Sequence, residues 1–336
     1  MFTDLFEKLG RRQDLTSDEA ATAMHAIMDG RATPVAISGL LVGLAMKGPR
    51  AAEIVGLARA MLAHAVECPI RRRPLVDLCG TGGDHSGTFN ISSVAALVVA
   101  SCGVPVAKHG NRGVSSACGS ADLFEALGVR ISAAPATVAR CLEQAGIAFL
   151  FAPLFHPSTR HASPVRAELG VRTAFNLLGP LTNPARPTHQ LVGVPRPDLT
   201  ELLARALASL ESERAWVVHG AGGLDELSTT GHSKVSECRG GAARTFYVHP
   251  SDFGLATATL AQLKGGDAAA NAAIARRVLA GEAGPARDVV LMNAAAALLV
   301  AGKVSTLRDG VGQAAAAVDR GDAARRLDLL VTWSQA

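Results

Sequence analysis

The sequence predicts an α/β protein in which a small all-helical N-terminal domain precedes a large domain with a mostly parallel central sheet. Helical spacing and helix caps recur before residue 74, and no strand pattern interrupts them. From Leu75 onward, short apolar runs alternate with helical patterns, as in parallel strands joined by helices. A length of 336 residues suits about two domains. We therefore assign residues 1–70 to the helical domain and 74–336 to the α/β domain.

Capping residues mark the expected N-terminal helices. Thr16 and Glu19 form a capping-box pattern at the start of one helix. Thr33 and Pro34 begin the next, with threonine as the cap and proline in the first turn. A further helix is expected over residues 51–65.

Short apolar runs mark the expected strands of the large domain. They lie at residues 75–79, 104–107, 129–132, 147–151, 191–194, 215–219 and 244–248. Helical patterns lie between most of them, near 94–101 and at 121–127, 135–145, 198–209 and 286–301. Ligands of open parallel sheets bind beyond the carboxyl ends of the strands. The polar segments that follow these strands are therefore the first candidates for a functional site.

The composition argues against several classes of function. With 33 Lys and Arg against 29 Asp and Glu, the net charge is +4, and no concentrated basic stripe typical of nucleic-acid binding is present. The longest apolar runs fall short of the ~20 residues needed to span a bilayer, and the N-terminus lacks a signal-peptide pattern. None of the six cysteines forms a Cys-x-x-Cys pair. We expect a cytoplasmic protein with reduced thiols that binds neither nucleic acid nor membranes.

The most informative stretch follows the first expected strand. Three glycines in the run Gly80–Asp84 allow backbone N–H groups to approach a ligand closely. A polar cluster at residues 88–93 opens the next helix, whose N-terminus adds unpaired N–H groups and a positive dipole end. Together these features predict an anion-binding site. A tight turn without a ligand needs fewer glycines and no hydroxyl cluster. The Walker and dinucleotide fingerprints are both absent.

Positive charge follows the second expected strand, in the run Lys108-His109-Gly110-Asn111-Arg112. Because the strands are expected to be parallel, this run and the glycine-rich loop should lie at one edge of the sheet. An anion bound between two strand ends is the interpretation that accounts for both.

A second region, residues 151–183, is rich in Pro, Gly and Asn and therefore poor at forming regular structure. We expect residues from about 160 to 185 to return to the helical domain and contribute to it. Arg166 stands in a short helix there and could bind a carboxylate through two hydrogen bonds. The alternative for Arg166 is an ordinary surface ion pair.

A third region places two acids after the strand at 215–219. Asp225 and Glu226 follow a glycine-rich strand exit and could hold a hard divalent cation. Magnesium takes one or two carboxylates and fills its remaining positions with water and phosphate oxygens. Adjacent acids also commonly cap helices, so this pattern alone does not decide between the two.

The motifs of these regions together resemble the anthranilate phosphoribosyltransferase family, and the resemblance covers nearly the whole chain. They are GTGGD (80–84), NIS (90–92), KHGNR (108–112), GSAD (119–122), HP (156–157), PVRAELG (164–170), FNLLGPLTNP (175–184) and GLDE (223–226). The resemblance implies the fold of the pyrimidine nucleoside phosphorylases, with a cleft between the two domains and a homodimer joined through the helical domains. It also implies a reaction in which the amine of anthranilate attacks C1 of phosphoribosyl pyrophosphate (PRPP) and expels pyrophosphate, a step of tryptophan biosynthesis.

The resemblance further implies which residues bind PRPP and magnesium. The PRPP site would comprise Gly80, Gly83, Asp84, Thr88, Asn90, Ile91, Ser92, Ser93, Lys108, His109, Gly110, Asn111, Arg112, Gly113, Val114, Ser115, Ser116 and Ser120. Two Mg²⁺ ions would be held by Ser92, Asp225 and Glu226.

For anthranilate, the resemblance implies a site formed by Gly80, Asn111, His156, Arg166 and Pro180, with Arg166 near the carboxylate. Two positions depart from the family pattern. Thr159 stands where a larger Met or Tyr is frequent, and Ala36 replaces a frequent Gln. Neither change removes a charge or a phosphate contact.

Catalysis should rest on positioning and electrostatics, because the leaving pyrophosphate is highly charged and an arylamine is a weak nucleophile. Lys108, His109 and Arg112 are the candidate catalytic residues. His109 could serve as a general base, or it could bind substrate and shape its loop. A nucleoside phosphorylase of the same fold and a non-catalytic nucleic-acid-binding relative are the competing hypotheses.

Overall fold

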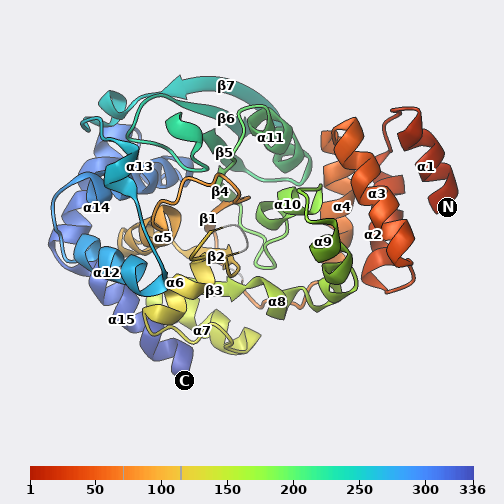
Figure 1. Cartoon of the computed structure of the whole chain (residues 1–336). Coiled ribbons are helices and arrows are strands. Elements are labelled where there is room, and N and C mark those ends of the chain that lie inside the picture. Colours follow the sequence, from red (N-terminus) through yellow and green to blue (C-terminus); the bar gives the residue numbers. More distant parts are fainter. Residues whose placement is uncertain (71, 114–115) are drawn as a thin grey trace.

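A computed structural model describes residues 1–70, 72–113 and 116–336 and shows a helical N-terminal part beside a larger α/β part (Figure 1). Four helices form the N-terminal part: α1 (Phe2–Gly10), α2 (Ser17–Met28), α3 (Pro34–Lys47) and α4 (Ala51–Ala63). The capping box of α2 is confirmed, since Glu19 N–H donates to Thr16 Oγ1 at 3.1 Å and Thr16 N–H donates to a Glu19 carboxylate oxygen at 2.9 Å. Thr33 caps α3 as expected.

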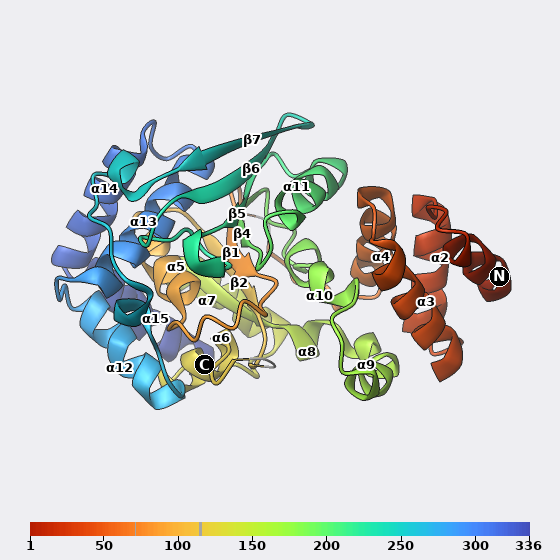
Figure 2. The same ribbon diagram turned by 45° about the horizontal axis from the view of Figure 1, so that its top comes forward.

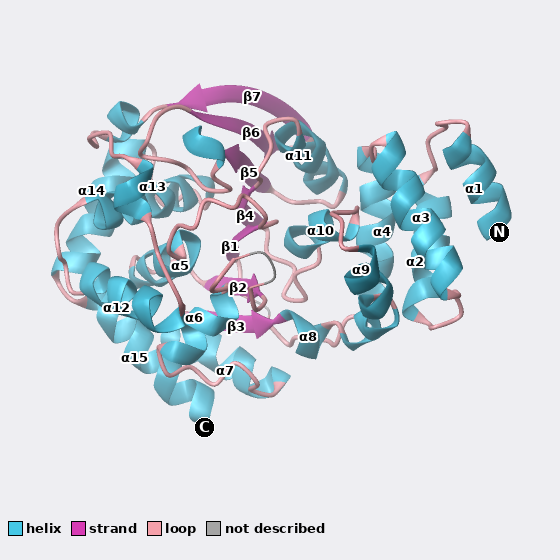
Figure 3. Ribbon diagram, viewed as in Figure 1, coloured by secondary structure: helices cyan, strands magenta, loops and turns pink. Residues whose placement is uncertain are grey.

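A single seven-stranded sheet forms the centre of the α/β part, in the order β3-β2-β1-β4-β5-β6-β7 (Figure 3). The strands are β1 (Val76–Gly80), β2 (Val106–Gly110), β3 (Ile147–Phe151), β4 (His189–Gly193), β5 (Arg214–His219), β6 (Ser233–Arg239) and β7 (Ala242–Val248). The first five are parallel, whereas β6 pairs antiparallel with both β5 and β7. The predicted fold class is confirmed.

A few elements differ from the prediction. Residues 129–132 form an irregular connection with a turn at 131–132, not a strand. Val129 and Ile131 are apolar because they are buried in the connection between two helices. Strand β6 was not predicted, because polar residues such as the buried Ser236 and Glu237 interrupt its apolar pattern. Glu237 is tolerated inside because it accepts hydrogen bonds from the side chains of Arg214 and Trp216. Helix α1 was not assigned either.

The remaining helices surround the sheet or connect its strands. They are α5 (Ile91–Ser101), α6 (Ser120–Ala126), α7 (Pro135–Ala145), α8 (Ala152–Phe155), α9 (Ser163–Leu169), α10 (Phe175–Leu178), α11 (Leu199–Ser209), α12 (Ala268–Leu279), α13 (Pro285–Val300), α14 (Leu307–Asp319) and α15 (Asp322–Gln335). Helix α5 packs on α13, α14 and α15 and forms the core of one layer. Helix α11 packs on β5 and β6 and also contacts α4. One apolar cluster therefore runs from Met24 and Leu57 in the helical part to Leu203 and Val217 in the α/β part.

The segment after β3 lies between the two parts of the molecule in both views (Figures 1 and 2). Helix α9 contacts α3, and α10 contacts α4. The 3-10 helix Pro157–His161 contacts α2. The chain then re-enters the α/β part at β4.

Asn183 fixes the end of this segment to the centre of the sheet. Its amide Nδ2 donates to Asp77 Oδ2 at 2.9 Å and to the carbonyl of Ala107 at 2.8 Å. Asp77 is fully buried and also accepts the backbone N–H of His109 at 3.2 Å. Burial raises the pKa of Asp77 to about 6, against the opposing effects of the Lys108 charge and the Asn183 hydrogen bond. A buried carboxylate depends on such partners.

All six cysteines are buried and free, as expected for reduced thiols in apolar surroundings. Among the described residues, none of the helices combines the length and the apolar character required to cross a membrane.

We predict that Asn183→Ala lowers the free energy of unfolding by about 3 kcal/mol, because a buried carboxylate and a carbonyl lose their donor. Urea denaturation measures the change. Asn176→Ala is the matched control: the Asn176 side chain accepts one hydrogen bond, from the backbone N–H of Thr173 at 2.8 Å, and is only half-buried. It should cost about 1 kcal/mol. Equal losses in the two variants would contradict a special role for Asn183.

Candidate active site

The glycine-rich loop after β1 lies directly against the acidic pair. A Cβ atom added to Gly80 would lie 2.6 Å from Asp225 Oδ2, and one added to Gly193, at the end of β4, would lie 1.5 Å from the carbonyl oxygen of Asp225. At Gly193 the close atoms are backbone, so only glycine permits the approach there, whereas a side chain at Gly80 would displace the Asp225 carboxylate. The N–H of Gly82 then donates to Asp225 Oδ2 at 2.9 Å. The glycine-rich loop and the Asp225 turn, which follow β1 and β5, therefore meet at one edge of the sheet.

Three carboxylates gather around this contact. The N–H of Asp225 donates to Asp84 Oδ2 at 3.4 Å, and the N–H of Ser92 donates to Glu226 Oε1 at 3.0 Å. Burial, followed by the charges of Asp84 and Glu226, raises the pKa of Asp225 well above its usual value. Burial also raises the pKa of Glu226, although the Lys108 charge and the Ser92 hydrogen bonds oppose the change. Concentrated, desolvated negative charge of this kind is stabilised by a cation.

The acidic group fits a divalent cation that brings its own further ligands. Within residues 1–70, 72–113 and 116–336, no three His, Cys, Asp or Glu side chains are arranged to hold one metal ion. Asp225 and Glu226 supply hard oxygen donors, and Ser92 stands beside Glu226. This donor set suits magnesium, which retains water and phosphate oxygens in its shell.

The N-terminus of α5 is built from the predicted polar cluster. The helix begins at Ile91, three residues before the expected start, with Asn90 as its cap residue. The Asn90 side chain donates to the carbonyl of Cys118 at 3.0 Å and accepts from Asn271 Nδ2 at 2.9 Å. Thr88 lies earlier in the loop, 3.2 Å from the hydroxyl of Ser86. Ser92 and the mostly buried Ser93 occupy the first helical turn.

Lys108 points into the protein beneath the loop. Its side chain is buried, its ammonium group donates to the carbonyl of Leu78, and its charge acts on Glu226 and Asp77. The lysine therefore supplies positive charge to the acidic group from the interior side.

His109 and His156 form a buried imidazole pair with ring centroids 5.4 Å apart. His109 Nδ1 lies 3.1 Å from the carbonyl of Gly179 and His156 Nε2 lies 2.8 Å from the carbonyl of Thr182, so each of these nitrogens carries a proton. Burial, then the charge of His156, lowers the pKa of His109 to about 3, and burial lowers the pKa of His156 to about 4. Each ring keeps one buried nitrogen without a partner among the described residues. Both imidazoles are therefore neutral acceptors and weak bases.

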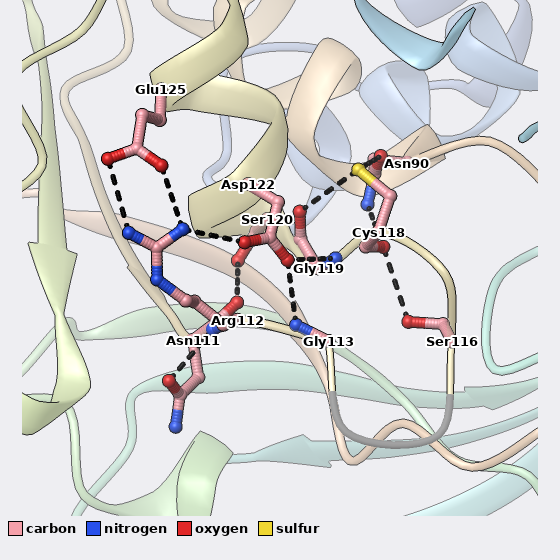
Figure 4. A network of polar contacts seen from close by, with 10 residues as sticks. All are labelled: Asn90, Asn111, Arg112, Gly113, Ser116, Cys118, Gly119, Ser120, Asp122 and Glu125. Atoms are coloured by element: carbon pink, nitrogen blue, oxygen red, sulfur yellow. Dashed lines mark hydrogen bonds and ion pairs between the residues drawn. The ribbon is translucent and has the colours of Figure 1, made fainter. Parts of the chain in front are cut away.

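Arg112 lies in an acidic network after β2 (Figure 4). Its guanidinium donates to Asp122 at 2.8 Å and to both oxygens of Glu125, at 2.8 and 3.1 Å. Asp122 also accepts the backbone N–H groups of Gly113 and Gly119, both at 2.9 Å. The network thus fixes both ends of the loop that carries the predicted phosphate ligands.

The other predicted residues of this loop lie around the network. The hydroxyl of Ser120 donates to the carbonyl of Asn111 at 3.4 Å and would lie 2.1 Å from a Cβ atom added to Gly110. The hydroxyl of Ser116 donates to the carbonyl of Cys118 at 3.2 Å. Val114 and Ser115 fall outside the described residues.

Two of the predicted anthranilate residues, Arg166 and Pro180, come from the returning segment, whereas Gly80 ends β1 and Asn111 follows β2. Arg166, on α9, places its guanidinium carbon 4.9 Å from the ring centroid of Phe175, and burial lowers its pKa. Among the described residues it forms no ion pair, so the alternative of a surface ion pair for Arg166 finds no support. Pro180 is buried, and its carbonyl accepts a hydrogen bond from Gln190 Nε2 at 2.7 Å.

Two residues that contribute to the site were not predicted from the sequence. Gly193 stands outside the recognised motifs, and only the spatial approach of Asp225 shows why it is glycine. Arg172 lies in the returning segment, and its guanidinium lies against Gly83. Its position between two recognised motifs offered no signal beyond its charge.

Comparisons with known proteins agree with this geometry. Residues 3–65 match the family described as "Glycosyl transferase family, helical bundle domain", and residues 72–324 match "Glycosyl transferase family, a/b domain". The chain is 54% identical to the anthranilate phosphoribosyltransferase of Moorella thermoacetica over 96% of its own length and 95% of the relative's. It is 51% identical to the anthranilate phosphoribosyltransferase of Roseiflexus sp. over 99% of its own length and 98% of the relative's.

Solved structures give the same result. The anthranilate phosphoribosyltransferase of Thermus thermophilus superposes with a TM-score of 0.94 at 46% identity, covering 98% of this chain and 99% of that one. The Saccharomyces cerevisiae enzyme in complex with PRPP and Mg has a TM-score of 0.91 at 28% identity, covering 99% and 98%. The chain therefore belongs to the anthranilate phosphoribosyltransferase family.

Proposed function

We propose that the protein transfers the phosphoribosyl group of PRPP to the amine of anthranilate, giving N-(5-phosphoribosyl)anthranilate and pyrophosphate in tryptophan biosynthesis. The observation that carries the proposal is the junction of the glycine-rich loop, the N-terminus of α5 and the Asp225–Glu226 pair at the strand ends. Relatives solved with PRPP and Mg, and with 4-fluoroanthranilate, support the substrates.

PRPP binds along this junction. The loop of Gly80, Gly83 and Asp84 and the α5 N-terminus from Asn90 to Ser93 offer backbone N–H groups to its phosphates. The segment from Lys108 to Ser116, with Ser120, encloses its pyrophosphate. Arg112 supplies a guanidinium whose orientation is already set by Asp122 and Glu125.

Two Mg²⁺ ions are held by Ser92, Asp225 and Glu226. When bound, magnesium neutralises the charge that builds on the departing pyrophosphate. The raised pKa values of Asp225 and Glu226 support this assignment, because these carboxylates lack a full counter-charge of their own.

Anthranilate binds beside the returning segment, between Gly80, Asn111, His156, Arg166 and Pro180. The guanidinium of Arg166 stacks on Phe175 with its donors free of ion pairs among the described residues, which suits a planar carboxylate. The low pKa of His109 makes it a weak general base, so it serves better to bind substrate and order its loop. Rate enhancement then comes from holding the amine near C1 and from stabilising the leaving charge.

Three further features extend the proposal. The segment from about 160 to 185 forms part of the helical domain (1–70), which packs against the α/β domain (74–336). The chain forms a homodimer through its helical domains, supported by Val35 and Met46 of α3, whose exposed fractions are 79% and 74%. The six free cysteines suit a reducing compartment, the cytoplasm.

The direct test follows the loss of anthranilate fluorescence on addition of PRPP and Mg²⁺, together with pyrophosphate release. Turnover that requires all three components supports the proposal. Phosphate-dependent release of a base from a nucleoside would instead identify a nucleoside phosphorylase, and steeply salt-dependent DNA binding without turnover would identify a nucleic-acid-binding protein.

Arg166→Ala should raise the KM for anthranilate by about 10- to 100-fold, because it removes a charge-assisted hydrogen-bonding group. The KM for PRPP should change little. Initial-rate kinetics with each substrate varied give both values, and Arg160→Ala, an exposed arginine of the same segment, is the control. Equal effects on the two KM values would refute the assignment.

Asp225→Asn combined with Glu226→Gln should lower kcat by about 100-fold or more and change the magnesium dependence of the rate. The measurement is turnover over a series of Mg²⁺ concentrations. Asp288→Asn serves as the control, since burial raises the pKa of this acid too, but it lies in α13 outside the site. Unchanged turnover in the double variant would exclude a role in metal binding.

Mg²⁺ binding should tighten as pH rises from about 6 to 8, because magnesium requires the deprotonated carboxylates. Burial raises the pKa of Glu226 to about 7, and it raises that of Asp225 well above its usual value, so protons compete with the metal and binding releases them. Calorimetry in two buffers of different ionisation enthalpy counts the released protons. Binding that is independent of pH and of buffer would contradict the prediction.

A further inference from the structure

Arg172 connects the returning segment to the glycine-rich loop. It stands between α9 and α10, six positions beyond Arg166 in the chain. A Cβ atom added to Gly83 would lie 1.6 Å from Arg172 Nη1 and 2.6 Å from its guanidinium carbon. Gly83 also has a φ of +81°, which disfavours any side chain. The guanidinium therefore rests directly on the backbone of Gly83, a position whose φ favours glycine.

The charges of nearby acids favour a guanidinium at this position. Partial burial lowers its pKa, whereas the negative charges of Asp225 and Asp84 act in the opposite direction. Among the described residues, its side chain donates no hydrogen bond. Arg112, in contrast, is paired with two carboxylates at the opposite loop. Arg172 is thus a guanidinium with free donors beside the acidic group and over the loop proposed to bind phosphate.

We propose that Arg172 is a further PRPP-binding residue, which acts as the counter-charge of Asp84 and Asp225 until magnesium binds and then donates its hydrogen bonds to the pyrophosphate group. This inference rests on the proposed function and assigns Arg172 a role within the same site. A guanidinium suits this exchange because it is always charged and presents several donors to phosphate oxygens.

The proposed movement of the Arg172 hydrogen bonds to pyrophosphate also couples the binding of the two substrates. Arg166, the proposed anthranilate ligand, and Arg172 lie at the two ends of the same short stretch, which begins in α9 and passes through Gly170. A ligand that fixes Arg172 on the pyrophosphate side therefore also fixes the stretch that presents Arg166. Binding of PRPP should for this reason favour subsequent binding of anthranilate.

The test compares Arg172→Gln with Arg196→Gln. Arg196 is the matched control because its charge also reaches Arg172 but its guanidinium is paired with Asp198. Mn²⁺ serves as the metal probe, with free Mn²⁺ measured by electron paramagnetic resonance without PRPP. Calorimetry measures PRPP binding in the presence of Mg²⁺. Thermal unfolding verifies that each variant is folded.

Arg172→Gln should bind Mn²⁺ about threefold more tightly, because a competing positive charge is removed, and should bind PRPP about tenfold more weakly. Arg196→Gln should leave both values near those of the wild type. Arg172→Lys retains the charge and should restore the wild-type Mn²⁺ affinity while recovering only part of the PRPP affinity. A general structural defect would weaken both ligands together, which these opposite shifts distinguish.

PRPP binding by Arg172→Gln within about twofold of the wild type, or Mn²⁺ binding that is unchanged or weaker, would overturn the inference. Failure of the wild-type protein to bind PRPP at all would instead refute the proposed function.

Discussion

The buried carboxylate of Asp77 is the constraint on which the arrangement of the site depends. It lies in the central part of the sheet, out of reach of water, and must therefore be matched by donors from the protein. Asn183 provides one donor and the backbone of His109 another. The Asp77 side chain therefore fixes both the returning segment and the end of β2. The carbonyl of Gly179, a few residues earlier, in turn orients the His109 ring. The proposed PRPP and anthranilate halves are thereby positioned from the same strand.

Close approach of backbone atoms creates the electrostatics of the site. Gly80 and Gly193 let the Asp225 turn rest directly on two strand ends, which brings Asp84 and Glu226 to the same place. The three positively charged side chains nearby differ in their interactions. Lys108 acts from beneath, Arg112 is held by two carboxylates, and Arg172 lies above the loop with free donors. The site therefore presents carboxylates that can bind magnesium and, nearby, positive side chains that can bind pyrophosphate, so a magnesium–pyrophosphate complex can contact both.

Features that depend on neighbouring residues, such as helix caps and strands, could be predicted from the sequence. The caps at Thr16 and Thr33 and the buried parallel strands follow from propensity and periodicity, and the placement of the glycine-rich loop beside the Lys108–Arg112 run follows from strand direction. Strand β6 was missed because its buried Glu237 is neutralised by arginines from other strands, and Val129 and Ile131 were misassigned because their burial comes from helix packing. Likewise, neither the ion pairing of Arg112 nor the contact of Arg172 with Gly83 can be read from spacing, since each depends on segments that meet only in the folded chain.

The apolar cluster shared by α2, α4, α11 and β5 has a consequence for how the molecule comes apart. Because Leu57 and Leu203 belong to one continuous core, opening the helical part would expose to water the side of α11 that packs on α4. Separation of the two parts is then costly, and slow amide hydrogen exchange should extend across both as a single cooperative unit.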